Sequence, residues 1–499
     1  VIATNADNKC PTASGLIRAE YPWTTPRDSS RRTRDWTAET DSPARVANSD
    51  SVARPSAGQF AHQDPIDIVE RLVHGRRLSQ RQCRMSRSKR LQTGQLRARF
   101  AAGLSAMYAA EVPAYGTLVE VCAQVNSDYL TRHRRAERLG SLQRVTAERH
   151  GAIRVGNPAE LAAVADLFAA FGMLPVGYYD LRTAESPIPV VSTAFRPIDA
   201  NELAHNPFRV FTSMLAIEDR RYFDADLRTR VQTFLARRQL FDPALLAQAR
   251  AIAADGGCDA DDAPAFVAAA VAAFALSREP VEKSWYDELS RVSAVAADIA
   301  GVGSTHINHL TPRVLDIDDL YRRMTERGIT MIDTIQGPPR TDGPDVLLRQ
   351  TSFRALAEPR MFRDEDGTVT PGILRVRFGE VEARGVALTP RGRERYEAAM
   401  AAADPAAVWA THFPSTDAEM AAQGLAYYRG GDPSAPIVYE DFLPASAAGI
   451  FRSNLDRDSQ TGDGPDDAGY NVDWLAGAIG RHIHDPYALY DALAQEERR

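Results

Sequence analysis

Two short segments with the same spacing of histidine and arginine constrain the fold more than any other feature of the sequence. His150 precedes Arg154 in H-G-A-I-R, and His309 precedes Arg313 in H-L-T-P-R. Each pair begins a predicted strand–helix–strand succession, and residues four apart on a strand share one face. A neutral imidazole can bind a divalent metal, and a guanidinium can bind a carboxylate through paired hydrogen bonds. The repeat therefore predicts two similar units that present a site for an anionic, metal-chelating substrate.

Hydrophobic periodicity divides the chain into six regions and predicts an α+β protein. Residues 1–90 are polar and lack a sustained apolar period, which is typical of a disordered or non-native extension. The other regions are a helical cap (91–148), a first βαβββ-like unit (149–204), a helical insertion (205–300), a second βαβββ-like unit carrying metal ligands (301–390), and C-terminal helices with a substrate loop (391–499). Two such units predict a duplicated half-barrel core.

The strands of the two units are predicted from the alternation of apolar and polar residues, and the helices from apolar residues that recur every three or four positions. In the first unit we expect a strand at His150, a helix at 159–171, and strands at 174–181 and 188–195. In the second unit we expect strands at 302–310, 329–335, 346–353 and 372–382, with a helix at 316–327. Residues 205–300 consist almost entirely of helix formers.

Charge and cysteine content exclude several classes of function. A formal net charge of −7 argues against a nucleic-acid-binding surface over the whole protein. The four cysteines show no CxxC spacing, which excludes a zinc–thiolate site and fits a reducing cytoplasm without disulfides. No apolar run reaches the roughly 18 residues that cross a bilayer. We therefore expect a cytoplasmic protein with neither membrane nor nucleic-acid partners.

The segment R-F-G-E-V-E-A-R-G supplies the candidate acidic ligands. Glu380 and Glu382 share one face of the predicted strand, and such a charged run is commonly a solvated, self-paired edge. Inside a barrel, a carboxylate requires a cation or metal. His150, His309 and one of the two glutamates would form a two-histidine, one-carboxylate set, which favours non-haem Fe(II). His306 would face away from His309 and is expected to be a packed or surface residue.

Several longer motifs identify a resemblance to a known family. They are E-R-H-G-A-I-R-V-G before 157, S-T-A-F-R-P-I-D at 192–199, H-I-N-H-L-T-P-R at 306–313, F-G-E-V-E-A-R-G-V-A-L-T-P at 378–390 and Y-E-D-F-L-P-A-S-A-A-G-I-F at 439–451. Over about residues 92–455 the chain closely resembles the 2-oxoadipate dioxygenase/decarboxylase family, also called 2-hydroxyglutarate synthases.

The resemblance implies a vicinal-oxygen-chelate-like core, an Fe(2+) cofactor and a step in D-lysine catabolism. The implied reaction converts 2-oxoadipate and O2 into 2-hydroxyglutarate and CO2. By motif position the iron ligands are His150, His309 and Glu382, the second glutamate of the run. Arg154 would bind a substrate carboxylate. The residues implied to contact the substrate are His150, Arg154, His309, Ala445 and Ser446.

Two other functions are compatible with the same residues. One is a different 2-oxo acid oxygenase or a metal lyase on the same scaffold, because a fold does not determine its chemistry. The other is a non-catalytic module that binds a 2-oxo acid. Release of CO2 from 2-oxoadipate in the presence of Fe(II) and air separates these alternatives from the implied reaction.

Overall fold

The structure is a computed structural model that describes residues 90–133, 144–145, 149–184, 187–355, 357–443 and 469–496. The chain separates into two compact units, Val1–Leu72 and Val73–Arg499, and every described element belongs to the second. The predicted extension at 1–90 therefore lies outside the described residues except for Arg90. That residue begins strand β1 (Arg90–Gln92), which pairs antiparallel with β6 (Gly257–Asp259).

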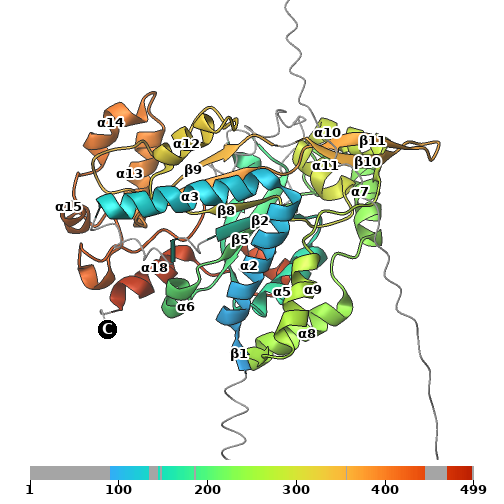
Figure 1. The fold of residues 1–499 in the computed structure, drawn as a ribbon, viewed down its shortest axis with the longest axis horizontal. Coiled ribbons are helices and arrows are strands. Elements are labelled where there is room, and N and C mark those ends of the chain that lie inside the picture. Colours follow the sequence, from blue (N-terminus) through green and yellow to red (C-terminus); the bar gives the residue numbers. More distant parts are fainter. Residues whose placement is uncertain are drawn as a thin grey trace, which may run out of the picture. The chain divides into compact units, whose positions relative to one another are not determined.

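Two long helices follow β1, as the sequence predicts. Helices α2 (Thr93–Glu111) and α3 (Pro113–Arg132) are separated by Val112, with a proline in the first turn of α3 where no backbone donor is needed. Figure 1 shows both helices lying near strands β2 and β8. The Tyr108 hydroxyl donates to the carbonyl oxygens of Asn308 and Phe378, at 3.0 and 2.8 Å. These bonds attach α2 to the residues directly before β8 (His309–Pro312) and β12 (Gly379–Arg384), two of the strands that carry the candidate site.

The first mixed unit forms most of a five-stranded sheet. Its elements are β2 (Arg149–Val155), α5 (Pro158–Ala169), β3 (Leu174–Asp180), β4 (Val190–Arg196) and β5 (Arg209–Leu215). The strand order is β3-β4-β5-β2-β8, with β2 and β5 parallel and the other pairs antiparallel. Strand β5 corrects the predicted boundary, because it lies inside the region 205–300 that we expected to be helical. Every residue of β5 is buried, so the alternation that would mark a half-exposed strand is absent.

The remainder of 205–300 is largely helical. The helices are α7 (Ala225–Arg237), α8 (Pro243–Asp255), α9 (Ala263–Ala272), α10 (Lys283–Val292) and α11 (Ala294–Gly301), with the short strand β7 (Val281–Glu282) before α10. Side-chain oxygens of Asp224, Asp242 and Ser293 cap the first turns of α7, α8 and α11.

The second mixed unit is less regular than the sequence predicts. Its elements are β8 (His309–Pro312), α12 (Ile317–Glu326), β9 (Leu348–Phe353), β10 (Glu358–Arg363), β11 (Val369–Leu374) and β12 (Gly379–Arg384). The expected strand at 302–310 is wrong for most of its length, since the strand covers only 309–312. The expected strand at 329–335 is reduced to isolated bridges that pair Met331 with Phe353 and Gln336 with Gln350.

The pairing in the second unit connects its strands to β8. Strand β12 pairs antiparallel with β9, and Glu382 of β12 forms a parallel bridge with Arg313, directly after β8. Because β8 also pairs antiparallel with β2, the chain places β2, β8 and β12 side by side. Strands β10 and β11 form a separate hairpin, paired with β7.

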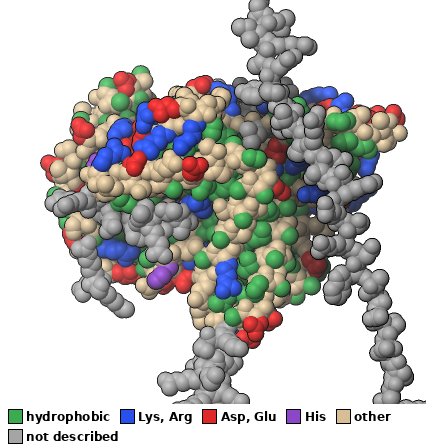
Figure 2. Space-filling model, in the orientation of Figure 1, with side chains coloured by type: hydrophobic (Ala, Val, Ile, Leu, Met, Phe, Trp, Pro, Cys, Tyr) green, Lys and Arg blue, Asp and Glu red, His purple; other side chains and the backbone are tan. Residues whose placement is uncertain are grey.

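Helices dominate the C-terminal part, as predicted. They are α13 (Pro390–Met400), α14 (Pro405–His412), α15 (Asp417–Ala422), α17 (Val472–Ile479) and α18 (Pro486–Gln495). Figure 2 shows basic and acidic side chains intermixed over the region of α12, where Arg322 and Arg323 form ion pairs with Asp319. No helix within the described ranges is long and apolar enough to cross a membrane.

Candidate metal centre

Strand β2 presents His150 and Arg154 on the same face. His150, Ala152 and Arg154 alternate with Ile153 and Val155, which pack into the apolar core on the opposite side. Ala152 belongs to a second core cluster, and the Phe442 ring meets the His150 ring edge-on at 5.0 Å between centroids. The prediction that His150 and Arg154 share a face is confirmed by this alternation.

Strands β8 and β12 bring the remaining candidate ligands to the same place. His309 begins β8, and Glu380, Glu382 and Arg384 lie on one face of β12. All four side chains are buried, so the charged run of β12 is not a solvated edge. Because β8 lies beside both β2 and β12, His309 is brought close to His150 and to Glu380.

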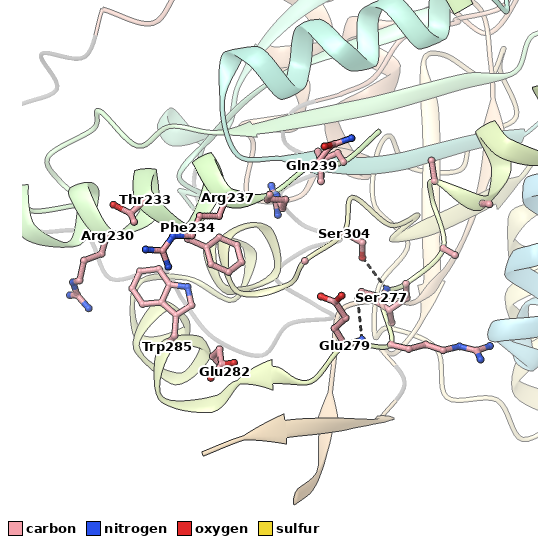
Figure 3. Close-up of a pocket in the computed structure, with 18 residues that line it drawn as sticks. Arg230, Thr233, Phe234, Arg237, Gln239, Ser277, Glu279, Glu282, Trp285 and Ser304 are labelled. Carbon is pink, nitrogen blue, oxygen red and sulfur yellow. Dashed lines mark hydrogen bonds between the residues drawn. The ribbon is translucent and has the colours of Figure 1, made fainter. Parts of the chain in front are cut away.

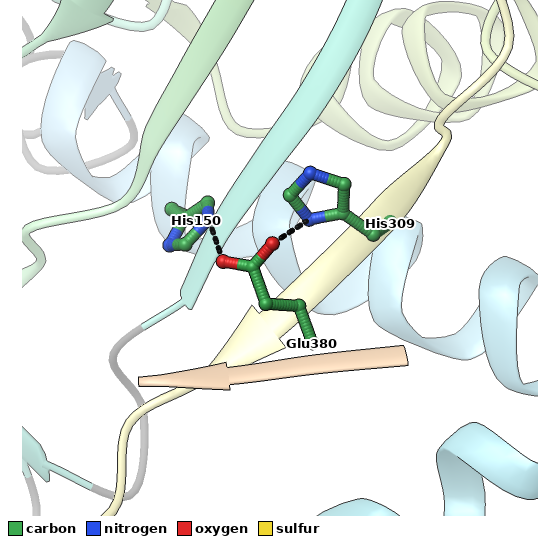
Figure 4. A group of neighbouring side chains, drawn as sticks. All are labelled: His150, His309 and Glu380. Atoms are coloured by element: carbon green, nitrogen blue, oxygen red, sulfur yellow. Dashed lines mark ion pairs between the residues drawn. The ribbon is translucent and has the colours of Figure 1, made fainter. Parts of the chain in front are cut away.

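Three side chains converge on one point (Figure 4). Oε1 of Glu380 lies 3.2 Å from Nε2 of His150, and Oε2 of Glu380 lies 3.7 Å from Nδ1 of His309. One ligand atom from each of the three lies within 4.8 Å of the others. The exposed fractions of His150, Glu380 and His309 are 1%, 2% and 4%. A buried carboxylate between two imidazoles is a donor set that a divalent cation fits.

Glu382, by contrast, already has its charge compensated by arginine. Nε and Nη2 of Arg384 donate to its two oxygens at 2.7 and 2.9 Å, and Nη1 of Arg209 lies 3.6 Å away. Burial raises the pKa of Glu382, but Arg384, His150 and Arg209 together hold it well below its usual range. Its Oε2 lies 3.0 Å from Nδ1 of His150. Glu382 is therefore placed to orient the His150 ring, as carboxylates behind metal-bound histidines do.

Glu380 has no such compensation. Among the described residues no lysine or arginine forms an ion pair with it, and its polar neighbour besides the two histidines is Gln350, whose Nε2 donates to Oε1 at 2.6 Å. A buried carboxylate without a cation is energetically costly. Of the two glutamates on β12, Glu380 is therefore the one whose charge no arginine compensates, and it is the better candidate for a metal ligand.

The two histidines differ in protonation. Burial is the main cause that lowers the pKa of His309 to about 4, so its ring is neutral and available as a ligand at neutral pH. Burial also lowers the pKa of His150, but Glu382 and Glu380 raise it by more, and the result is a value above the usual 6.5. A metal at this site therefore competes with a proton on His150.

Arg154 lies on the same face of β2 but has a carboxylate partner. Its Nη1 donates a short hydrogen bond to Oδ2 of Asp298 in helix α11. The positive charge of Arg154 also contributes to the lowered pKa of His309, which indicates that the guanidinium is close to the metal site. Arg154 thus lies near the candidate metal ligands with its charge paired to the Asp298 carboxylate.

Comparison with known proteins identifies the family. The family model described as 2-oxoadipate dioxygenase/decarboxylase matches residues 100–454. The chain belongs to this family. The 2-oxoadipate dioxygenase/decarboxylase of Pseudomonas putida is 40% identical over 452 residues, covering 81% of this chain and 95% of that protein. The protein of the same name from Escherichia coli is 39% identical over 447 residues, with 81% and 97% covered.

A solved structure extends the family likeness to three dimensions. The Pseudomonas putida hydroxyglutarate synthase in complex with 2-oxoadipate aligns with a TM-score of 0.69 and 37% identity, covering 81% of this chain and 97% of that chain. The family resemblance seen in the sequence motifs is therefore confirmed.

The site also contains residues that the sequence interpretation missed. Asp298, Gln350 and Arg209 contact the candidate residues, and the sequence interpretation gave none of them a role. Arg209 and Gln350 lie in the family-like segments N-P-F-R-V-F-T-S and L-L-R-Q-T-S-F, but only the tertiary structure shows what they contact. His306 is buried and lies 3.2 Å from Asp298, so it is packed rather than exposed. Positions 445 and 446, where the resemblance implies substrate contacts by Ala445 and Ser446, lie outside the described residues.

Proposed function

We propose that the chain is an Fe(II)-dependent enzyme that converts 2-oxoadipate and O2 into 2-hydroxyglutarate and CO2, a step in D-lysine catabolism. The observation that carries this proposal is the convergence of His150, His309 and Glu380 in a buried site of a chain that belongs to the 2-oxoadipate dioxygenase/decarboxylase family. Two histidines and one carboxylate with open positions are the donor set typical of non-haem Fe(II) oxygenases.

We assign the metal-holding role to His150, His309 and Glu380. Motif position favours Glu382 instead, but its ion pairs with Arg384 and Arg209 support a role behind His150. When bound, Fe(II) in such a set supplies coordination positions for an oxo acid and for O2. The buried rings of Phe442 and Phe378 pack against His150 and His309, which limits access of water to this centre.

We assign the binding of a substrate carboxylate to Arg154. A dicarboxylic oxo acid carries two negative charges, and the guanidinium beside the metal site offers a planar set of donors for one of them. We also assign substrate contacts to Ala445 and Ser446, as the family resemblance implies. These roles would orient 2-oxoadipate with its keto acid end toward the histidines.

We also infer that the core is a duplicated βαβββ structure of the vicinal-oxygen-chelate type. In the first unit β2 lies next to β5, then β4, then β3. In the second, β8 lies next to β12, then β9, then the bridged residues Met331 and Gln336. The same neighbour order around a first strand, each followed by a helix, supports the duplication.

The proposed function is tested by stoichiometry. Purified full-length protein supplied with Fe(II), 2-oxoadipate and air is expected to consume O2 and release CO2 and 2-hydroxyglutarate in equal amounts, and His309→Ala is expected to abolish all three. Preference for a shorter oxo acid would indicate another oxygenase on this scaffold. Binding of 2-oxoadipate with no CO2 release would indicate a non-catalytic module and reject the proposal.

A further inference from the structure

A buried carboxylate in the helical insertion makes direct contact with Arg154. Asp298 lies in α11 with an exposed fraction of 2%. Its Oδ2 accepts hydrogen bonds from Nη1 of Arg154 and, at 2.9 Å, from Nδ2 of Asn308. Its Oδ1 lies 3.2 Å from Nε2 of His306. The carboxylate thus joins β2 to the segment just before β8.

The position of Asp298 is itself fixed by two side chains that bind the end of α11. Nε1 of Trp285 donates to the carbonyl oxygen of Ala300 at 2.8 Å. Nη1 of Arg238 donates to the carbonyl oxygens of Ile299 and Val302, at 2.5 and 2.9 Å. Carbonyls at a helix C-terminus lack partners within the helix, so these bonds anchor its last turn.

The anchoring residues lie at a cavity lined mainly by residues of the helical insertion. Trp285 and Arg238 are among the residues that line a hollow of about 1010 Å³, part of which is drawn in Figure 3. Arg238 is also paired with Glu160 of α5 at 2.7 Å. Arg238 therefore connects the end of α11 to α5 of the first mixed unit. These contacts hold Asp298, a residue of α11, in a fixed position next to Arg154.

We infer that Asp298 is a positioning residue that holds the Arg154 guanidinium in the orientation needed to bind a substrate carboxylate. This inference rests on the proposed function of Arg154. A guanidinium can rotate about several bonds, and a fixed carboxylate at Nη1 sets the plane of its remaining donors before substrate arrives. The helical insertion is therefore part of the substrate site and not an appendage to the core.

Steady-state kinetics of the iron-loaded full-length protein test the inference. Asp298→Asn is expected to raise the KM for 2-oxoadipate about 10- to 100-fold while kcat changes much less, because orientation of the substrate is lost and the metal site is not. Asp287→Asn, at an exposed position of the neighbouring helix α10, serves as the matched control and should behave like the wild type. An unchanged KM in folded Asp298→Asn would overturn the inference.

A double variant separates positioning from a purely structural role. If Asp298 acts through Arg154, adding Asp298→Asn to Arg154→Met should leave the KM of the single Arg154→Met variant unchanged. A further loss equal to that seen in the wild-type background would refute the inference. Should Asp298→Asn fail to fold because Arg154 is left as an uncompensated buried charge, the double variant is expected to fold again. Failure of the double variant to fold would also count against the inference.

Calorimetric titration of 2-oxoadipate in the absence of O2 distinguishes failure of the inference from failure of the proposed function. Wild-type protein that binds 2-oxoadipate but never turns it over would reject the proposed function alone. In that situation Asp298→Asn is still expected to bind 2-oxoadipate about 10-fold more weakly. Equal affinities would overturn the inference, whether or not the wild type is catalytically active.

Discussion

At the scale of single residues, two glutamates that share one face of β12 have different electrostatic surroundings. Glu382 is held by Arg384 and lies near Arg209, whereas Glu380 meets two histidines and the Gln350 amide. A carboxylate whose charge is already compensated gains less from a metal ion than one that is not. The electrostatics therefore predict different consequences for the two isosteric substitutions.

Glu380→Gln and Glu382→Gln should separate metal binding from stability. We expect Glu380→Gln to retain little iron after gel filtration, with a metal-free stability close to that of the wild type. Glu382→Gln removes the carboxylate that pairs with buried Arg384, while Arg209 keeps Glu440, so the free energy of unfolding should fall by about 3–5 kcal/mol. Elemental analysis and urea unfolding measure the two effects. Iron loss confined to Glu382→Gln would reverse the assignment and make Glu382 the ligand.

The raised pKa of His150 predicts how the stability of the metal-free protein varies with pH. Burial lowers this pKa, but the two glutamates raise it by more. A proton on His150 therefore stabilises the fold below the unfolded-state pKa of about 6.5, and this contribution is lost as pH rises through the higher folded-state value. Urea unfolding of metal-free wild type and His150→Gln, from about pH 6 to about pH 9, should show a stability difference that shrinks with pH. A stability difference that stays constant or grows with pH would contradict the raised pKa of His150.

At the scale of elements, the sequence predicts those parts of the fold that local pattern determines. The helix before Pro113 and the helix at 159–171 were predictable because their apolar residues recur at helical spacing beside proline or asparagine signals. Strand β5 was not, because it is buried on both faces and its sequence R-V-F-T-S-M-L does not alternate between polar and apolar residues. The choice between Glu380 and Glu382 was also beyond local pattern. Arg384 lies on the same face of β12 as both glutamates, and only the tertiary structure shows that it pairs with Glu382 and that Arg209 lies nearby.

The end of β12 offers a prediction about backbone packing. Gly385 donates from its N–H to the carbonyl of Leu347 at 2.8 Å, and a Cβ at this position would overlap the backbone carbonyl of Asp345. Gly385→Ala should therefore displace the end of β12, costing about 1–3 kcal/mol of unfolding free energy and weakening iron binding. Urea unfolding and metal analysis measure both.

A second glycine provides the matched control for this substitution. Gly477 lies in helix α17, and a Cβ there would have no heavy atom within 4 Å. Gly477→Ala should stabilise the protein by about 0.5–1 kcal/mol, because alanine loses less conformational freedom in a helix than glycine does. If Gly385→Ala were as well tolerated as Gly477→Ala, the close approach of β12 to Asp345 would not constrain the site.

At the scale of the whole molecule, the candidate metal centre lies where the two mixed units join. His150 comes from the first strand of one unit, while His309 and Glu380 come from the first and last strands of the other. The antiparallel pairing of β2 with β8 connects the backbones of the two units. A metal ion held by all three side chains would therefore cross-link the units as well as support chemistry.

This arrangement predicts that metal removal destabilises the entire fold. A ligand that binds the folded state and not the unfolded state, at a free concentration 100 times its dissociation constant, adds about 2.7 kcal/mol to stability. We expect a chelator to lower the unfolding midpoint of the iron-loaded wild type and to have no effect on His309→Ala, which lacks one ligand. Circular dichroism with parallel elemental analysis measures both quantities. If iron leaves the wild-type protein while its midpoint stays constant, the metal does not bridge the two units, and His150 cannot share one ion with His309 and Glu380.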